Sequence, residues 1–228
     1  MVQPAQLAHH AVMTTENTTA GAEQALASLV RAETELQDLY QHHMVDRPFG
    51  HQDLYLLGIA RRTLAQSQAF KKCVEDRNGL VAAALLRLQL DTVLRIYALY
   101  WVADPEAFAG RVFAGEQIDR LKAADGKQMK DRYLIDKIKE RNPWVEDVYK
   151  NTSGLIHFSD RHIHSAICLN GDDGPAQFLL GPINPEHTFA DFQELLEAFF
   201  HCTGMIVVAA GDWFANFNTI HRRSPPPD

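Results

Sequence analysis

One stretch decides the fold: LVAAALLRLQLDTVLRIYALYWV, Leu80–Val102. It is apolar nearly all the way round the helix that it predicts, which is typical of a helix in the centre of a protein. Three charges, Arg87, Asp91 and Arg95, argue against a membrane span, because each costs roughly 2.5–3.5 kcal/mol at the centre of a bilayer. The apolar run Met205–Gly211 is too short to span. We therefore expect a buried helix and no contact with a membrane.

Amphipathic patterns flank this central helix on both sides. Apolar residues recur at spacings of three and four, and Asp46–Gly50 (DRPFG) separates the first two patterns. Thr188 with Asp191 resembles a capping box that opens a last long helix. The expected flanking helices span residues 16–43, 51–76, 105–124, 130–140, 143–160 and 188–218. Short connections between helices favour an antiparallel bundle, so the expected fold class is mainly α.

Between the last two helices the pattern changes. HIHSAICLN and PAQFLLG are short apolar runs around GDDG (Gly171–Gly174), which predicts a small β-hairpin at about residues 163–181. Residues 1–15 are expected to be a flexible leader, residues 16–220 a single helical domain, and residues 221–228 a disordered tail.

Composition sets further bounds. The chain has 228 residues, 46% of them hydrophobic, with a formal net charge of −7, which argues against a protein that coats nucleic acid through overall basicity. Three cysteines without a CxxC and no signal peptide favour a cytoplasmic protein. Neither GxGxxG nor GKS/GKT occurs, so we expect no cofactor.

Arg87, Asp91 and Arg95 form the first polar stripe, since spacings of four place them on one narrow arc of the central helix. Charges among so many leucines need partners. One interpretation is an internal ion pair in which Asp91 lies between the two arginines. The other is that the arginines line a cleft that binds an anion.

The second polar stripe lies in VYKNTSGLIHFSDRHIHS, Val148–Ser165. A continuous helix would place one set of polar residues on one face: Lys150, Ser153, His157, Asp160, Arg161 and His164. Ser153 and His157 are one turn apart and are expected to hydrogen-bond. His157 is then either a histidine of the core or a general acid/base, because imidazole titrates near neutral pH.

The same histidines also allow a metal site. His157, His162 and His164, with Asp160, form a His-x4-His-x-His cluster whose side chains suit zinc. His162 and His164 would share a strand face. The spacing matches no known zinc motif, so this remains the third alternative.

The segment Arg120–Arg141 is locally basic. It holds eight Lys/Arg against four acids, an excess of four, and only Tyr133 to stack on a base. A basic approach to the helix that carries His157 would suit a phosphate-bearing ligand such as RNA. The alternative interpretation, which is the commoner case, is an ordinary solvated helix face.

GLVAAALLRLQLDTVLRIYALYW and VYKNTSGLIHFSDRHIHS together resemble a family of uncharacterised bacterial helical proteins related to HEPN domains. That family pairs an Arg-x3-acid helix (here Arg87 and Asp91) with a Ser-x3-His helix (here Ser153 and His157). The resemblance implies a helical bundle that binds or cleaves RNA in bacterial defence or stress, as a homodimer. The chain departs from the Arg-x4–6-His motif of active HEPN nucleases, because Lys150 is the nearest basic residue before His157.

The expected function is therefore a HEPN-like protein that acts on RNA. In it His157 is the acid/base or phosphate-contacting group, and Ser153 orients it. Arg87 and Arg95 hold the anion with Asp91, and Lys150 and Arg161 add positive charge. A non-catalytic module with a protein partner is the alternative, and a metal-dependent hydrolase is the second alternative.

Overall fold

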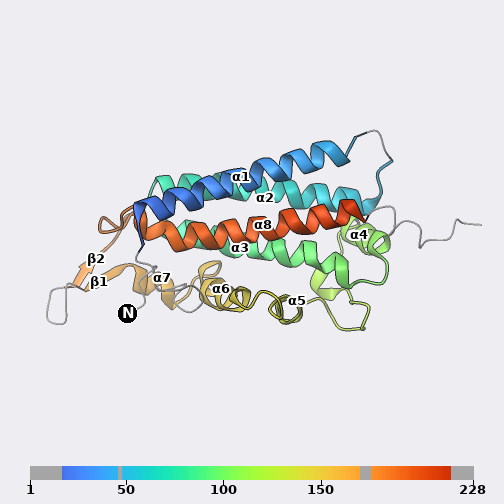
Figure 1. Ribbon diagram of the computed structural model, residues 1–228. Helices are drawn as coiled ribbons and strands as arrows, with labels where there is room; N and C mark the ends of the chain where they lie inside the picture. The colour runs from blue at the N-terminus through green and yellow to red at the C-terminus, as the bar shows by residue number, and fades with distance from the viewer. Residues whose placement is uncertain (1–16, 46–47, 170–175, 217–228) are drawn as a thin grey trace, which may run out of the picture.

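The computed structural model describes residues 17–45, 48–169 and 176–216. The expected leader and tail and the GDDG turn lie outside these residues. The predicted mainly α fold is confirmed: four long helices pack together along their length (Figure 1). They are α1 (Thr19–His43), α2 (His51–Glu75), α3 (Gly79–Ala98) and α8 (Gln193–Ala215).

The predicted central helix is the core of this bundle. Among the residues of α3, Leu90, Val93 and Leu94 are fully buried, and they lie in one cluster with Leu29 of α1 and Phe199 of α8. The Gln89 amide donates to the Thr203 hydroxyl across 3.0 Å, so the buried polar groups between α3 and α8 are partly paired.

The last helix runs parallel to α1 and α3 rather than antiparallel to them. At one end, the N–H of Thr18 donates to Gln193 Oε1 across 2.8 Å. At the other end, the rings of Tyr40 and Phe214 lie 5.1 Å apart, edge to face. The direction follows from the long segment between α3 and α8, which returns the chain to the end of the bundle where α3 begins (Figure 1).

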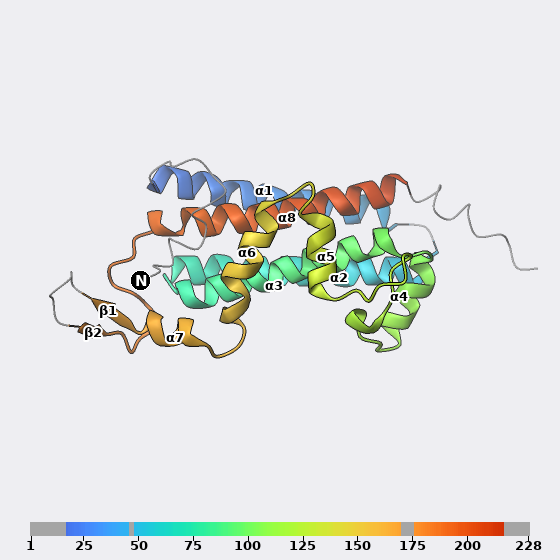
Figure 2. The same ribbon diagram turned by 90° about the horizontal axis from the view of Figure 1, so that it is seen from below.

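Short helices in this long segment form a second layer across α3 (Figure 2). The 3-10 helix Leu99–Trp101 leads to α4 (Pro105–Phe113), which Asp104 caps by accepting from the N–H of Ala107 across 2.9 Å. Then follow α5 (Asp131–Ile138), α6 (Trp144–Thr152) and α7 (Asp160–Ser165), with 3-10 turns at Ile118–Arg120 and Ser153–Leu155.

Two strands follow α7: β1 (Ile167–Leu169) pairs antiparallel with β2 (Ala176–Phe178). The paired segment is shorter than predicted, because His162 and His164 belong to α7. Ser159 is the N-cap of α7, and its N–H donates to His162 Nδ1 across 3.2 Å, so a new helix begins where a strand was expected.

Among the described residues, one stretch is long and apolar enough to be a candidate membrane span: Ala190–Ala215, with a mean hydropathy of 1.3. Its helix α8 buries Phe199, Cys202 and Ile206 fully against the rest of the bundle. A core helix passes the same test, so this is weak evidence for a membrane.

Candidate anion-binding site

Five charged side chains form one chain of ion pairs on the face of α3 that the second layer covers. Arg62 of α2 pairs with Asp91 across 3.0 Å, and Asp91 pairs with Arg95 across 2.6 Å. Arg95 continues to Asp131 across 2.5 Å, and Asp131 reaches Arg87 across 2.9 Å. Three guanidinium groups face two carboxylates, so this charged network carries one net positive charge.

The predicted stripe is thus correct, but its expected pairing is wrong for one residue. Asp91 does pair with Arg95, whereas Arg87 pairs with Asp131. Asp131 is the first residue of α5, which packs on α3 from the second layer. The Arg87 side chain therefore points toward α5 and α6 and not along α3 toward Asp91.

Arg87 is the most deeply buried charge of the network, with only 6% of its side chain exposed. Its guanidinium carbon lies 4.5 Å from the centre of the Tyr149 ring on α6, a cation–π contact that offsets part of the cost of burial. Its Nε, like Nη1 of Arg95, has no hydrogen-bond partner among the described residues.

Arg95 sits in the middle of the network. Burial lowers its pKa, but the carboxylates of Asp91 and Asp131 outweigh burial, so the pKa of Arg95 lies above its ordinary value. The hydroxyl of Tyr55 donates to the backbone carbonyl of Arg95 across 2.8 Å and holds α2 against this turn of α3. The network meets solvent through Arg62, whose side chain is 41% exposed.

The second predicted stripe does not form one face, because the helix ends at Thr152 and a new one begins at Asp160. The Ser153 hydroxyl donates to the carbonyl of Tyr149, one turn back, and not to His157. His157 is exposed and makes no hydrogen bond with a described residue, so the prediction of a histidine of the core is wrong.

The two basic residues of that stripe have local partners. Lys150 pairs with Glu146 on its own helix across 3.4 Å, an exposed pair that contributes little to stability. Arg161 donates to the backbone carbonyl of Asn151 across 2.5 Å, near the end of α6. Arg161 thereby satisfies a carbonyl of the last turn of α6, and we assign it a capping role.

The metal hypothesis finds no support in the geometry. Within the described parts of the chain, no group of three or more His, Cys, Asp or Glu side chains lies close enough together to hold a metal ion. His157, His162 and His164 are all described, and they do not converge. The His162 ring instead stacks on Phe158, with 5.6 Å between centroids. Within the described residues these three histidines therefore form no metal site.

Most cations of the basic segment lie at the surface, while two of its four acids, Asp131 and Asp136, are ion-paired. Asp131 points into the charged network, and Asp136 pairs with Arg132 and Lys139. In the described part of the chain, six cations of this segment make no ion pair. They are Arg120, Lys122, Lys127, Lys130, Lys137 and Arg141, and all six are exposed. We call these six residues the basic face.

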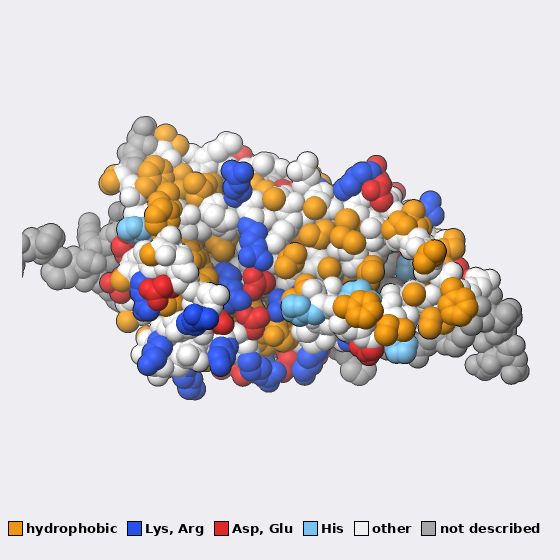
Figure 3. All heavy atoms as spheres, turned by 180° about the vertical axis from the view of Figure 1, so that it is seen from behind, with side chains coloured by type: hydrophobic (Ala, Val, Ile, Leu, Met, Phe, Trp, Pro, Cys, Tyr) orange, Lys and Arg blue, Asp and Glu red, His pale blue; other side chains and the backbone are white. Residues whose placement is uncertain are grey.

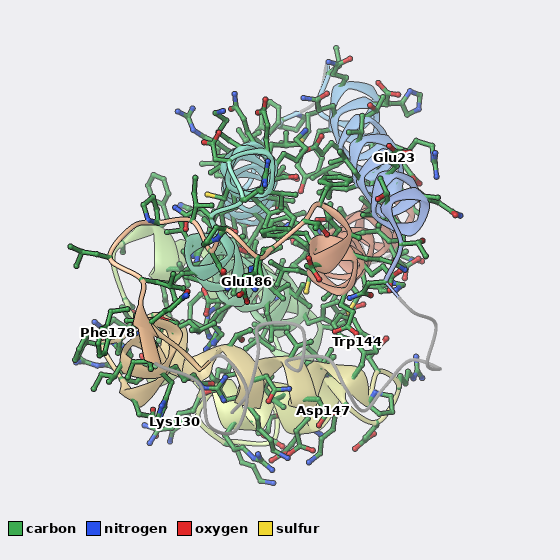
Figure 4. The ribbon with its side chains drawn as sticks, turned by 90° about the vertical axis from the view of Figure 1, so that its left-hand side faces the viewer. Glu23, Lys130, Trp144, Asp147, Phe178 and Glu186 are labelled. Atoms are coloured by element: carbon green, nitrogen blue, oxygen red, sulfur yellow. The ribbon has the colours of Figure 1, made fainter. Side chains whose placement is uncertain are left out.

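Figure 3 shows Lys and Arg side chains gathered along the lower edge of the molecule, over α5 and the loop before it, below a band of mixed charge on α3. Lys130 points outward at this edge in Figure 4. Asp125 and Glu140 are the acids of the segment that remain exposed. The basic face and the charged network share one junction, at Lys130 and Asp131.

Comparison with models of known protein families, with curated proteins and with solved structures gives no match. The resemblance to HEPN domains therefore stays a prediction from the two motifs.

Arg62, Asp131 and Tyr149 complete the site, and the sequence did not single them out. Arg62 lies in an ordinary Arg61–Arg62 pair on α2. Asp131 lies in the first turn of a helix, where acids are common because of the helix dipole. Tyr149 occurs in the quoted motif VYKNTSG. The only feature of the sequence that could have pointed to Tyr149 is that its aromatic ring precedes a lysine.

Proposed function

We propose that the chain binds RNA, or another phosphate-bearing polyanion, on the basic face. The observation that carries the proposal is the separation of charge in Arg120–Arg141: six exposed cations make no ion pair within the described residues, while Asp131 is directed inward to Arg87 and Arg95. A solvated helix face usually intersperses both signs. Here the six cations outnumber the exposed acids Asp125 and Glu140, which leaves the surface basic on a chain whose net charge is −7.

Nearby aromatic rings favour nucleic acid over a small phosphate. The carbonyl of Trp101 accepts from the N–H of Ala124 across 2.7 Å, which ties the basic loop to the end of α3. The rings of Tyr97 and Tyr100 lie 5.8 Å apart, and Tyr97 and Trp101 lie 6.2 Å apart. Tyr100 is 42% exposed, so part of this aromatic cluster is open to contact with a base.

Binding is better supported than cleavage. A general base needs a second group to orient it or a proton within hydrogen-bond reach. The Ser153 hydroxyl donates to the backbone carbonyl of Tyr149. His157 has no group among the described residues that orients it by a hydrogen bond. Asp91 and Asp131 hold the arginines in place, so Arg87 and Arg95 contribute positive charge beneath the surface. A place in bacterial defence or stress rests on the HEPN resemblance alone.

Fluorescence anisotropy with a labelled single-stranded RNA tests the proposal. The triple variant Lys122→Gln/Lys127→Gln/Lys130→Gln removes three charges from the basic face. The matched control Arg31→Gln/Arg61→Gln/Lys72→Gln removes three exposed charges from α1 and α2. We expect the first variant to bind at least about tenfold more weakly than the wild type and the control to bind within about twofold of it. Equal affinities for all three proteins would overturn the proposal.

The non-catalytic interaction module is the second candidate, and one observation favours it. Exposed apolar side chains gather at the end of the molecule where α7 and the strands lie, and such surfaces mark interaction sites.

A further inference from the structure

The end of the molecule beyond α6 exposes an unusual amount of apolar surface. Phe158 is 83% exposed, Phe178 78%, and Leu180 is fully exposed. Three isoleucines join them, and together the six are called the apolar end. Its members are Ile156, Phe158, Ile163, Phe178, Leu180 and Ile183, each at least 40% exposed. Figure 3 shows hydrophobic side chains gathered over α7 and the strands, and Phe178 lies at the periphery in Figure 4.

Two contacts join the segments that carry the apolar end. The Phe158 ring stacks on His162 of α7. The N–H of Leu179 donates to the carbonyl of Ala166 across 2.9 Å, which fastens the end of β2 to the end of α7. The helix that carries Ile163 therefore contacts Phe158 through His162 and adjoins Phe178 and Leu180, the neighbours of Leu179, at its C-terminal end.

The area is close to what a stable interface needs. A large apolar side chain has an area of about 150–250 Å², so at these exposures the six residues present roughly 600–1,000 Å². The largest apolar patch on a typical monomer is about 300–600 Å². A standard interface takes about 800 Å² from each partner. The apolar end is thus larger than a monomer usually leaves in water and matches one side of an interface.

The strands leave an open edge at the same place. Pairs in an antiparallel ladder alternate between hydrogen-bonded and non-hydrogen-bonded. Leu179 donates to Ala166, so the next pair, Phe178 opposite Ile167, is of the second kind. The N–H and carbonyl of Phe178 therefore point away from β1, toward the free edge of β2. An open edge with large apolar side chains is a template for another strand.

The two strands also lack support of their own. A two-stranded sheet is marginal in water, and three or more strands with an apolar face are needed for stability. Here each strand has three residues, and α7 is the helix that packs beside them. Strands from another polypeptide chain would enlarge the sheet and stabilise it.

We propose that the apolar end is the interface for a second copy of the chain, in which β2 pairs antiparallel with its symmetry equivalent to make one four-stranded sheet. A second copy fits because an antiparallel edge is complementary to itself, and both copies contribute the same apolar residues. The register that uses the free groups places Phe178 opposite its symmetry equivalent. If both copies bury the whole apolar end, the buried area of the pair is roughly 1,200–2,000 Å², within the standard class. This interface is separate from the basic face and does not depend on RNA binding.

The test is the mass of the full chain in solution, by light scattering and sedimentation, from low micromolar to submillimolar concentration. We expect the wild type to be a dimer and Phe178→Ser/Leu180→Ser to be a monomer, with a dissociation constant at least about thirtyfold higher, the effect of one lost hot spot. The matched control is Phe113→Ser/Val208→Ser, which changes exposed side chains of α4 and α8. It should stay dimeric.

Backbone pairing has a test of its own. Phe178→Pro removes an N–H that β1 does not use, and Phe178→Ala removes the same ring but keeps the N–H. The proline variant should dimerise more weakly than the alanine variant at unchanged circular dichroism. A wild type that is monomeric at every concentration, or a dimer that survives Phe178→Ser/Leu180→Ser, would overturn the interface. Equal dimerisation of the proline and alanine variants would overturn the strand pairing.

Discussion

The carboxylate of Asp131 lies 2.5 Å from the guanidinium of Arg95, although 36 positions separate the two residues in the chain. This contact fastens the second layer to the central helix. It also removes an acid from the basic segment, because the same carboxylate accepts from Arg87. One side chain therefore serves both the stability of the fold and the charge of the surface.

Asp131→Asn is expected to destabilise the fold. It keeps the shape of the side chain but leaves Arg87 and Arg95 without a shared counter-charge. Breaking a buried pair costs about 3–5 kcal/mol, and since Asp131 is 26% exposed we expect about 3 kcal/mol or slightly less. Urea denaturation measures the free energy of unfolding. Glu140→Gln, which changes an exposed acid just beyond the C-terminal end of α5, is the control and should change the free energy of unfolding by less than about 0.5 kcal/mol. Equal effects would mean that the network adds nothing to stability.

Glu106 is expected to make stability depend on pH in the acid range. It accepts from the N–H groups of His51 and Gln52, across 2.7 and 3.1 Å, at the start of α2. Partial burial raises its pKa, but these donors outweigh burial, and the pKa of Glu106 lies below the ordinary 4.5. A depressed folded-state pKa means that its contribution is complete well above pH 4.5 and is lost as the pH falls through the folded value.

Glu106→Gln should therefore lower the free energy of unfolding by about 1 kcal/mol at pH 7, as the loss of a helix cap does. The difference should shrink as the pH falls below 4.5. Thermal unfolding of both proteins between pH 7 and pH 3 measures the difference. Gly50→Ala is a companion variant, because a Cβ there would lie 2.6 Å from Glu106 Oε2 and displace the carboxylate. A difference in stability between wild type and Glu106→Gln that stays constant from pH 7 to pH 3 would contradict the capping role of Glu106.

Metal-free cleavage separates binding from catalysis. A pool of structured RNAs incubated with the wild type in EDTA should remain intact, because Ser153 is bonded to Tyr149 and His157 has no orienting group among the described residues. His157→Ala should bind RNA as well as the wild type. Cleavage by the wild type that disappears in His157→Ala, with both proteins folded, would establish a nuclease and return His157 and Ser153 to the catalytic roles that the sequence suggested.

The sequence predicts α3 well, because a stretch that is apolar all round and carries three charges on one arc fits a buried helix and little else. It does not predict the direction of α8, since parallel and antiparallel packing bury the same apolar faces. Nor does it predict the pairing of Arg87, because its partner Asp131 comes from another layer. Local patterns determine elements, whereas contacts between distant elements depend on packing.

The histidines show a different limit. Ile163 and Ile167 give residues 163–169 a strand-like composition, and the prediction placed His162 and His164 on a strand face. Ser159 begins a helix two residues after His157, and this local cap outweighs the β-branched residues that follow. The metal site and the continuous polar face both depended on the missed boundary.

The salt dependence of RNA binding tests the central claim most directly. Each phosphate contact on single-stranded nucleic acid contributes about −0.7 to the slope of log K against log salt concentration, so about five contacts from the basic face predict a slope of about −3 to −4. Lys122→Gln/Lys127→Gln/Lys130→Gln should reduce the magnitude of the slope by about 2, while the control variant on α1 and α2 keeps the wild-type slope. Identical slopes for wild type and triple variant would contradict the account, because they would show that these lysines do not contact phosphate.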